Sequence, residues 1–205
     1  MPHLQTVIAH YTPLVKQDAP GYQVLDWSSR ESQFLRFEIL AHEIRQIPGK
    51  TPFRLLDVGC GMAELRGYLS GQNIPVEYVG VDLTPAVLAE ARRRNPGLDL
   101  RALDVFANPQ PFPDHSFDVV FCSGVFNLRQ DNSLSFAQQG LARLTALASR
   151  LAAVNFLHAR TNIQFPECCY FTPEELQDYA KRPDTTVTVR DNYLDNDFTI
   201  FAHYS

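Results

Sequence analysis

The stretch that decides the fold runs Phe53-Arg54-Leu55-Leu56-Asp57-Val58-Gly59-Cys60-Gly61-Met62-Ala63-Glu64-Leu65. An apolar run ends at the acidic Asp57, two glycines follow one residue apart, and apolar residues then resume with helical spacing. This pattern predicts a buried strand, a tight turn and a helix. Glycine at positions 59 and 61 permits a sharp turn and leaves bare peptide groups beside the unpaired N–H groups of a helix start. The turn suits a bound ligand, although a tight strand-to-helix turn without any ligand explains the same residues.

The composition predicts a single domain over residues 1–205. With 45% apolar and 11% aromatic residues, a chain of this length can bury one substantial core. We expect residues 1–50 to form an N-terminal arm and helix, and residues 51–205 to form the core of the domain. The net charge of -5 makes nucleic acid an unlikely partner, because no global basic field would attract it.

The first ten residues, the apolar runs and the cysteines predict a cytoplasmic setting. The first ten residues lack the pattern of a signal peptide, and no apolar run approaches the length of a membrane span. The four cysteines, at positions 60, 122, 168 and 169, lack the paired CxxC spacing of a zinc site. We therefore expect a soluble, cytoplasmic protein with reduced thiols, no metal and no membrane partner. No pattern in the chain indicates an oligomeric state.

The N-terminal segment precedes the first strand as an arm and a helix. Residues 1–27 are interrupted by prolines and read as an irregular arm or lid. Ser28 and Glu31 have the spacing of a capping box, and apolar residues then recur every three or four positions until Pro48-Gly49. We expect an amphipathic helix here, with Arg36 on its solvated side.

Alternating apolar strands and amphipathic helices fill the rest of the chain. A parallel sheet covered by helices is expected from this alternation. The last two strands are separated by a short polar segment without a helix, which predicts an antiparallel pair at the sheet edge. The expected strands are 53–58, 76–82, 98–102, 117–122, 151–157, 185–190 and 198–203, and the expected helices are 62–70, one capped by Thr84 and running to Asn95, one from after Asp131 toward Ser149, and one from Thr172 to Arg182.

Polar or glycine residues follow four of these strands. In an open parallel sheet, ligands bind outside the carboxyl ends of the strands. Asp82 follows Gly59 by about the interval at which an acid at the end of a second strand accepts hydrogen bonds from ribose hydroxyls, so a nucleoside is implied. Capping of the next helix beside Thr84 is the alternative role for Asp82, and capping of its own loop is the alternative for Asp104. The four marked positions are Asp57 to Gly61, Asp82, Asp104 and Ser123-Gly124.

The glycine turn argues against a dinucleotide. A dinucleotide site has a third glycine where this chain has Glu64, and the anionic Asp57 would repel a pyrophosphate. An acid at this position suits a ligand with a cationic amino group. A nicotinamide oxidoreductase is therefore disfavoured.

With these motifs in order, residues 52–205 resemble the class I S-adenosylmethionine-dependent methyltransferases. The one clear departure is Ala63, where many members of that family carry a third glycine. The stretches that carry the resemblance are Leu55 to Gly61, Tyr78 to Thr84, Leu103-Asp104-Val105 and Phe117 to Gly124.

The resemblance implies an α/β, Rossmann-like, doubly wound sheet of seven strands with the order 3-2-1-4-5-7-6, strand 7 antiparallel, and an N-terminal helical lid. It also implies S-adenosylmethionine as cofactor, with S-adenosylhomocysteine as product. By position, the family's cofactor-binding roles fall on Asp57, Gly59, Cys60 and Gly61 for the methionine part, Asp82 for the ribose, Asp104 and Val105 for the adenine, and Ser123, Gly124 and Val125 for the cofactor edge. Leu83, next to Asp82, is a further candidate contact of the cofactor.

The segment from Leu25 to Phe37 resembles the leader of a small bacterial subgroup of the same family. In that comparison Arg30 or Gln33 reaches the cofactor carboxylate and Trp27 closes over the cofactor. Core packing explains Trp27 and Phe34 equally well.

The implied activity is methyl transfer to a small-molecule acceptor by in-line displacement, which requires mainly positioning and exclusion of water. Asn127 and His158 are candidate catalytic residues because they follow the fourth and fifth strands. A turn cap explains Asn127 as well, and an exposed loop position explains His158. Two alternative functions remain: a non-catalytic protein of this fold that binds S-adenosylmethionine or S-adenosylhomocysteine, and a protein or RNA methyltransferase.

Overall fold

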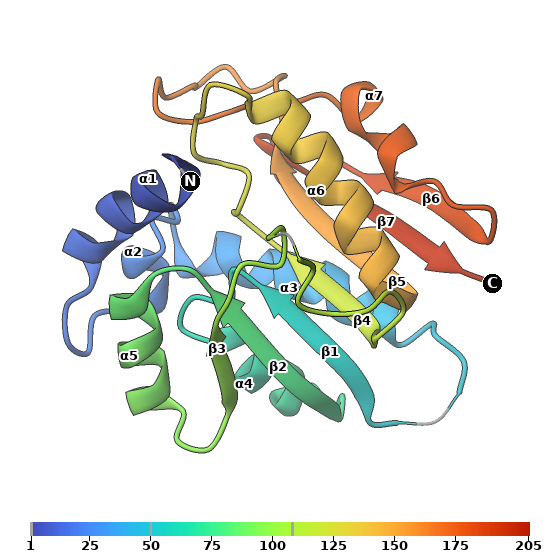
Figure 1. Cartoon of the computed structure of the whole chain (residues 1–205), viewed down its shortest axis with the longest axis horizontal. Helices are drawn as coiled ribbons and strands as arrows, with labels where there is room; N and C mark the ends of the chain where they lie inside the picture. Colours follow the sequence, from blue (N-terminus) through green and yellow to red (C-terminus); the bar gives the residue numbers. More distant parts are fainter. Residues whose placement is uncertain (1, 50, 108) are drawn as a thin grey trace. The chain divides into compact units, whose positions relative to one another are not determined.

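The computed structural model describes residues 2–49, 51–107 and 109–205 (Figure 1). The chain divides into two compact units, Met1–Pro111 and Phe112–Ser205. Seven strands form one sheet with the order β3-β2-β1-β4-β5-β7-β6, and β7 runs antiparallel to both β5 and β6. This order and the antiparallel seventh strand confirm the predicted fold class.

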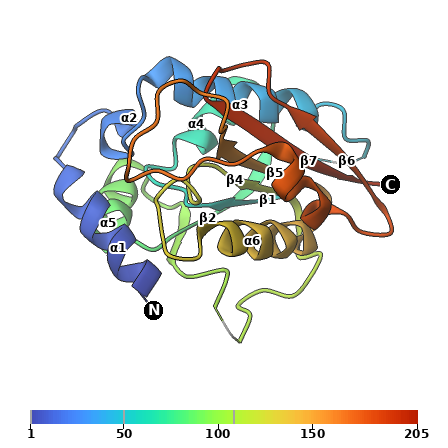
Figure 2. The ribbon, with the colours of Figure 1, turned by 90° about the horizontal axis from the view of Figure 1, so that it is seen from above.

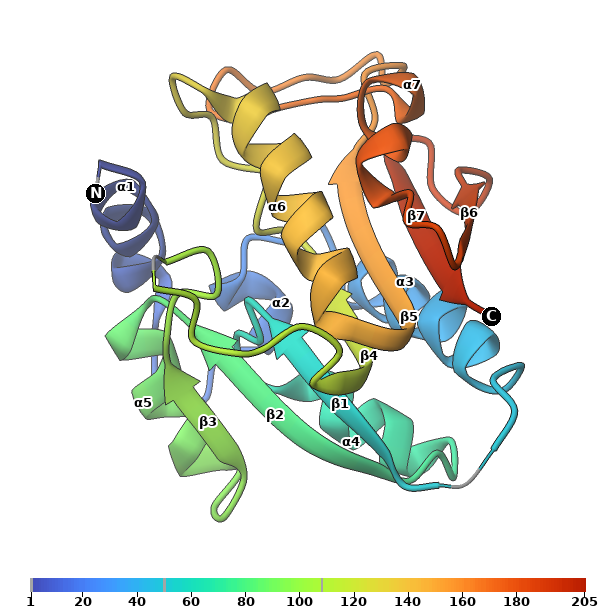
Figure 3. The ribbon, with the colours of Figure 1, turned by 45° about the vertical axis from the view of Figure 1, so that its right-hand side comes forward.

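Three parallel strands organise the N-terminal unit. They are β1 (Phe53–Val58), β2 (Val76–Asp82) and β3 (Asp99–Ala102). The crossovers between them are the helices α4 (Glu64–Gly71) and α5 (Pro85–Arg94). Both helices lie on the same side of these strands (Figure 3). This is the arrangement expected when parallel strands follow one another across a sheet through right-handed crossovers.

The N-terminal arm is more helical than its sequence predicts. The segment expected to be irregular contains α1 (Pro2–Tyr11), a 3-10 turn η1 (Thr12–Leu14) and a single turn α2 (Gly21–Val24), before the long α3 (Arg30–Ile44). Each proline there lies at or before the start of a turn, where a missing N–H is tolerated.

Two details of α3 differ from the prediction. Ser29, and not Ser28, caps the helix, and its hydroxyl accepts a hydrogen bond from the backbone N–H of Ser32 at 3.0 Å. Arg36 is only 2% exposed, so its expected place on a solvated face is wrong. Its guanidinium lies 4.1 Å from the ring centre of Trp27. The indole ring therefore faces the charged head of Arg36, while Nη1 donates to the Ser32 carbonyl.

The C-terminal unit contains the other four strands: β4 (Phe117–Cys122), β5 (Ala148–Leu157), β6 (Thr185–Arg190) and β7 (Asp197–Tyr204). The helix α6 (Ser133–Leu147) packs along β4 and β5 (Figure 2) and passes directly into β5, which therefore begins three residues earlier than predicted. The predicted capping box of Thr172 and Glu175 is present at the start of α7 (Pro173–Leu176), and a 3-10 turn η2 (Gln177–Ala180) follows.

Aromatic rings fill the core of the C-terminal unit. Phe126, Phe156 and Phe198 stack in a row with ring centres 5.2 and 5.5 Å apart, and Phe171 meets Phe156 edge-on. All four are buried. Offset and edge-on packing of this kind adds stability beyond the buried area. Within the described part of the chain, no helix combines the length and apolar character that crossing a membrane requires.

Candidate functional site

Asp82 ties together the turns that follow β1 and β2. Its Oδ2 accepts a hydrogen bond from the Gly61 N–H at 3.1 Å, and its Oδ1 accepts one from the Thr84 N–H at 2.8 Å. The structure therefore contains the capping contact that was the alternative role for Asp82. A carboxylate offers about four acceptor positions, so these two bonds leave capacity for two hydroxyl donors. Burial raises the pKa of Asp82, and the two backbone donors act in the opposite direction.

Asp57 is 5% exposed at the end of β1, where few carboxylates are found. Its Oδ2 accepts a hydrogen bond of 2.6 Å from the hydroxyl of Tyr78 on β2. Burial raises the pKa of Asp57 to about 7; the Tyr78 hydrogen bond lowers it and the nearby Asp82 raises it. Asp57 is consequently an acid whose charge changes near neutral pH.

The glycine turn uses left-handed backbone at three positions. Gly59 and Gly61 have φ of 72° and 53°, and Ala63 has φ of 58°. The N–H groups of Gly59 and Cys60 both donate to the Val81 carbonyl, which holds the turn against the end of β2. The third position keeps the conformation that a glycine favours although the residue has changed to alanine.

The N-terminal arm lies on this turn. A Cβ built on Gly61 would be 2.6 Å from both terminal methyl carbons of Leu25. Gly21 is similarly close to the Glu64 carboxylate, where a Cβ would lie 2.2 Å from Oε2. Glu64 Oε2 also accepts a hydrogen bond of 2.9 Å from Gln33 Nε2. These contacts attach the arm to the first turn of α4. A side chain at Gly21 or Gly61 would require Glu64 or Leu25 to move, and at Gly61 the φ of 53° would add backbone strain.

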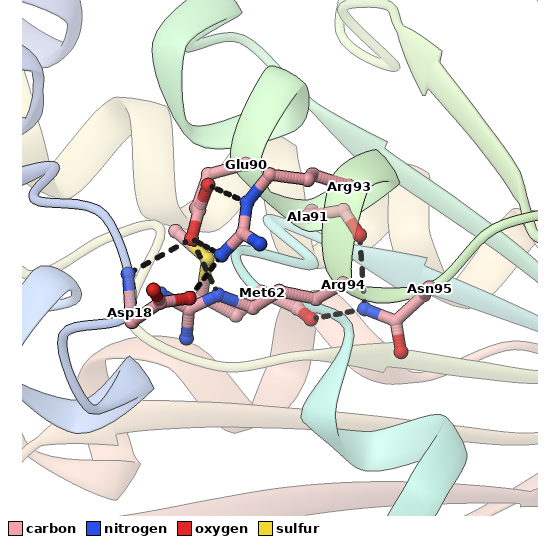
Figure 4. Close-up of polar contacts among 7 residues, drawn as sticks. All are labelled: Asp18, Met62, Glu90, Ala91, Arg93, Arg94 and Asn95. Atoms are coloured by element: carbon pink, nitrogen blue, oxygen red, sulfur yellow. Dashed lines mark hydrogen bonds and ion pairs between the residues drawn. The ribbon is translucent and has the colours of Figure 1, made fainter.

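Polar contacts from α5 brace the same region (Figure 4). Asn95 Nδ2 donates to the carbonyls of Met62, in the glycine turn, and Ala91, both at 3.0 Å. Glu90 accepts hydrogen bonds from Arg93, Arg94 and the backbone N–H of Asp18. The Asp18 carboxylate pairs with Arg93. The arm and the glycine turn are therefore both fixed to α5.

Three residues of the leader segment were expected near the cofactor. Arg30 is exposed, with its guanidinium 4.5 Å from the ring centre of Phe34. Gln33 is 3% exposed, and because its Nε2 is bound to Glu64, its Oε1 is left without a hydrogen-bond partner among the described residues. Trp27 is half-buried against Arg36. Gln33 is connected to the start of α4, directly after the glycine turn, through Glu64.

The predicted adenine and ribose neighbours follow β2 and β3. Leu83 is half-buried directly after β2, and Val105 is 2% exposed after β3. Asp104 Oδ1 accepts a hydrogen bond from the Phe106 N–H at 2.9 Å. Asp104 thus caps its own loop, which was the alternative considered for it.

In the C-terminal unit, Ser123 and Gly124 follow β4 as expected. Gly124 has φ of 85°, and the Ser123 hydroxyl donates to Asn155 Oδ1 at 3.2 Å. Asn155 is fully buried and its Nδ2 donates to Asp197 Oδ2 and the Tyr193 hydroxyl. A buried polar network therefore supports the residue after β4.

His158 does not occupy an exposed loop position. It is 8% exposed, its ring meets Phe198 edge-on, and its Nδ1 accepts the Arg160 N–H at 3.3 Å. Burial lowers the pKa of His158, which favours the neutral ring. Because Nδ1 accepts the Arg160 N–H, the neutral ring carries its proton on Nε2.

Asn127 joins the loop after β4 to the segment before α7. Its N–H donates to the Gly124 carbonyl, and its carbonyl accepts from the Cys169 N–H. Its side-chain Oδ1 is buried without a hydrogen-bond partner among the described residues. The backbone contact supports a turn cap, and the side chain keeps an acceptor available.

Sequence reasoning missed four contact residues: Leu25, Glu64, Tyr78 and Asn95. Asn95 is followed by Pro96 and Gly97, which mark the end of a helix. Asparagine at a helix end commonly bonds nearby backbone carbonyls, so its capping contact could have been predicted from the sequence. The contact of Tyr78 with Asp57 depends on strand register, because Asp57 pairs with Gly80 and not with Tyr78.

Solved structures share the fold over the whole chain. Magnesium protoporphyrin IX methyltransferase from Synechocystis PCC 6803, solved with bound SAH, covers 99% of this chain and is itself covered completely, with a TM-score of 0.68 and 13% identity.

Sequence relatives match about half of the chain. Trans-aconitate 2-methyltransferase from Methylobacterium nodulans is 35% identical over 45% of this chain and 37% of its own length. Demethylmenaquinone methyltransferase from Thermus thermophilus is 36% identical over 52% of this chain and 49% of its own length. This chain thus matches less than half of the length of either relative.

The family model described as a methyltransferase domain matches residues 55–161, from β1 to just beyond β5. The match includes the glycine turn, Asp82, Asp104 and the residues after β4. With this match and the strand order 3-2-1-4-5-7-6, the chain belongs to the methyltransferase domain family, in the class I, Rossmann-like group of S-adenosylmethionine-dependent methyltransferases.

Proposed function

We propose that this protein transfers a methyl group from S-adenosylmethionine to a small-molecule acceptor. The proposal rests on one observation: two carboxylates lie beside the glycine turn, inside the region that the family model matches. Asp57 and Asp82 stand at the ends of β1 and β2, and Asp82 contacts the turn directly. Two carboxylates suit a cationic amino group and ribose hydroxyls, and they oppose a pyrophosphate.

The described residues fit the proposed cofactor. Asp82 has acceptor positions for ribose hydroxyls, Asp57 supplies a carboxylate for the amino group, and the turn presents glycine backbone. When bound, the cofactor would supply an electrophilic methyl group on a sulfonium to a lone pair of the acceptor, with S-adenosylhomocysteine as the other product. The protein's part is to align the acceptor and exclude water.

The acceptor is proposed to be a small molecule because the named relatives are methyltransferases of trans-aconitate and demethylmenaquinone. The candidate acceptor contacts are His158, which offers an N–H at Nε2, and Asn127, whose Oδ1 accepts hydrogen bonds. Neither is a strong base: the lowered pKa of His158 favours its neutral form, and an amide does not titrate. Without a strong base, His158 and Asn127 suit an acceptor that is already nucleophilic and needs no deprotonation.

Calorimetric titration with S-adenosylmethionine, S-adenosylhomocysteine and NAD tests the cofactor, with Asp82→Ala as the informative variant. Loss of the Asp82 carboxylate should weaken binding of both adenosyl ligands by about 1 to 3 kcal/mol, because ribose hydroxyls lose a charged acceptor. Asp99→Ala is the matched control. Asp99 is an exposed carboxylate at the amino end of β3, whereas the proposed site lies at the carboxyl ends of the strands. Unchanged affinity in a folded Asp82→Ala variant would contradict the ribose role.

A turnover assay separates the enzyme from a non-catalytic binding protein of the same fold. The purified protein is incubated with S-adenosylmethionine and candidate acceptors grouped as carboxylates, phenols and amines, and formation of S-adenosylhomocysteine is measured. Product with one small-molecule group supports the proposal. Product only with a protein or RNA substrate would replace the acceptor class.

A further inference from the structure

We propose that Tyr78 is a positioning residue for the cofactor, whose hydroxyl holds the Asp57 carboxylate in the orientation and ionised form that the amino group of the cofactor requires. The inference rests on the proposed function, because it assumes that Asp57 receives that amino group.

The geometry of the strand pair makes the contact possible. In the register of β1 and β2, Leu55 lies opposite Tyr78 and Asp57 lies opposite Gly80. The Tyr78 side chain must therefore extend along β2 past Gly80 to reach Asp57, and the hydroxyl ends 2.6 Å from Oδ2. A hydrogen bond this short is typical of a hydroxyl donating to a carboxylate.

Gly80 leaves the space for this reach. A Cβ built there would lie 3.0 Å from Cε1 of Tyr78, 2.9 Å from Sγ of Cys60 and 2.7 Å from a methyl carbon of Leu100. The ring of Tyr78 thus occupies part of the volume that a larger residue at position 80 would fill. Gly80 and Tyr78, two positions apart on β2, therefore act together: the missing side chain of Gly80 lets the Tyr78 hydroxyl reach Asp57 on β1.

Both partners are enclosed. Tyr78 is 7% exposed and Asp57 is 5% exposed, so water competes poorly for either group. A buried carboxylate without a donor is costly, and the Tyr78 hydroxyl is the side-chain donor that the structure provides for Asp57. Fixing one oxygen on Tyr78 also fixes the direction of the other oxygen, which is the one left for a cationic ligand.

The ionisable groups that face Asp57 in the N-terminal unit determine how its charge responds to pH. They are Tyr78 and Asp82 on β2 and Cys60 in the glycine turn. Burial and Asp82 favour the neutral acid, the Tyr78 hydrogen bond favours the carboxylate, and the thiol of Cys60 stays neutral because burial raises its pKa. With the pKa of Asp57 at about 7, the carboxylate forms as the pH rises through neutrality. Binding of a cationic amino group should strengthen over the same range.

Two ligands that differ only in the amino-acid part test this role. S-adenosylhomocysteine contains the amino group, whereas 5′-methylthioadenosine keeps the adenine and ribose and lacks it. Affinities for both are measured by calorimetry from about pH 6 to about pH 9. The proteins are the wild type, Tyr78→Phe, Asp57→Asn, the double variant and Tyr68→Phe. Tyr68 is the matched control because it is a tyrosine of α4 that packs on Phe34 and Phe37.

Tyr78→Phe should weaken S-adenosylhomocysteine by about tenfold near pH 7, since a hydrogen bond to a charged group is lost. The weakening should fade at high pH, where Asp57 is ionised in either protein, so the pH profile moves upward. Affinity for 5′-methylthioadenosine should stay unchanged, as should both affinities of Tyr68→Phe. In the Asp57→Asn background, Tyr78→Phe should add no further loss.

Three results would overturn the inference. Equal weakening of both ligands at every pH would mean that Tyr78 only supports the fold of the strand pair. Additive losses in the double variant would mean that Tyr78 acts through a group other than Asp57. Failure of the wild type to bind either ligand would overturn the proposed function itself, and this outcome is distinct because it appears before any substitution. Should Tyr78→Phe fail to fold, Asp57→Asn is compared with the wild type. A selective loss of S-adenosylhomocysteine binding with no remaining pH dependence supports the inference, and unchanged binding of both ligands overturns it, because Tyr78 would then have no ligand-binding carboxylate to position.

Discussion

Ala63 occupies a backbone conformation that glycine adopts more readily. Its φ of 58° and ψ of 30° lie in the left-handed region, and the residue is 1% exposed at the start of α4. An L-residue in the left-handed backbone region costs roughly 1 to 2 kcal/mol relative to glycine. Burial of the Ala63 methyl group, and the lower conformational entropy of alanine than of glycine in the unfolded chain, partly offset this cost. Alanine at this position, where many family members carry a third glycine, thus adopts left-handed backbone at a modest energetic cost.

Ala63→Gly is therefore expected to leave the free energy of unfolding unchanged or to raise it by up to about 1 kcal/mol. Ala89→Gly changes a solvent-exposed residue in the middle of α5 and should lower the free energy of unfolding by about 1 kcal/mol. The reason is that glycine has a lower helix propensity than alanine where the backbone is right-handed. Denaturant unfolding of both variants checks the contrast. A loss for Ala63→Gly as large as that for Ala89→Gly would show that strain at position 63 is absent.

At the scale of elements, α5 connects two other parts of the N-terminal unit. Its Glu90 binds the arm at Asp18, and the residue at its C-terminal end, Asn95, binds the glycine turn at Met62 (Figure 4). An apolar cluster of Val24, Met62 and Val87 lies in the same region, with Leu25 packed against it. The position of the turn therefore depends on contacts from a helix and an arm as well as on its own glycines.

Glu90→Gln should lower the denaturant midpoint at neutral pH, because the neutral amide binds Arg93 and Arg94 more weakly. The two arginines hold the pKa of Glu90 below its ordinary value of 4.5. A carboxyl with a lowered pKa stabilises the folded state fully above its unfolded pKa and loses that contribution as the pH falls. The difference between wild type and Glu90→Gln should accordingly shrink below about pH 4.5.

Glu77→Gln provides the matched comparison, since Glu77 is exposed on β2. This substitution should leave the denaturant midpoint nearly unchanged, both at neutral pH and below about pH 4.5. An equal effect of the two substitutions, or a difference for Glu90→Gln that persists in acid, would contradict the role of this ion-pair cluster.

The elements also show which features a sequence reveals. The strands were predictable because apolar runs, strand-end acids and capping residues are local signals. The order of the strands in the sheet was implied by the resemblance to the class I methyltransferases, because no local signal says which strands pair. The turns of the arm were not, because short Pro-interrupted helices are held by distant partners, as Val24 is by Met62. Two adjacent serines carry the same capping signal, so Ser29 could not be chosen over Ser28. The burial of Arg36 depends on the placement of Trp27.

The candidate site divides in the same way. The roles of Asp57, Asp82 and the glycines follow from their order along the chain and stay predictions until binding is measured. Contacts across strands or between arm and turn, such as Tyr78 with Asp57 and Leu25 with Gly61, require the fold before they can be seen.

At the scale of the whole molecule, ligand binding should appear as stability. A ligand that binds only the folded state at about 100 times its dissociation constant adds about 2.7 kcal/mol to the free energy of unfolding. For a chain of this size, that corresponds to a rise in melting temperature of roughly 5 to 10 °C. Thermal scans with saturating S-adenosylhomocysteine should show this rise, and scans with NAD at the same concentration should not. A rise with NAD alone would point to the disfavoured dinucleotide class.

The stacking of Arg36 on Trp27 has a practical consequence. Trp27 is the only tryptophan among the 205 residues, and it lies between the arm and α3. Because indole emission responds to the polarity and charge of its surroundings, the chain contains its own optical reporter at this junction. Stopped-flow fluorescence can then follow movement of the arm in real time without an attached dye.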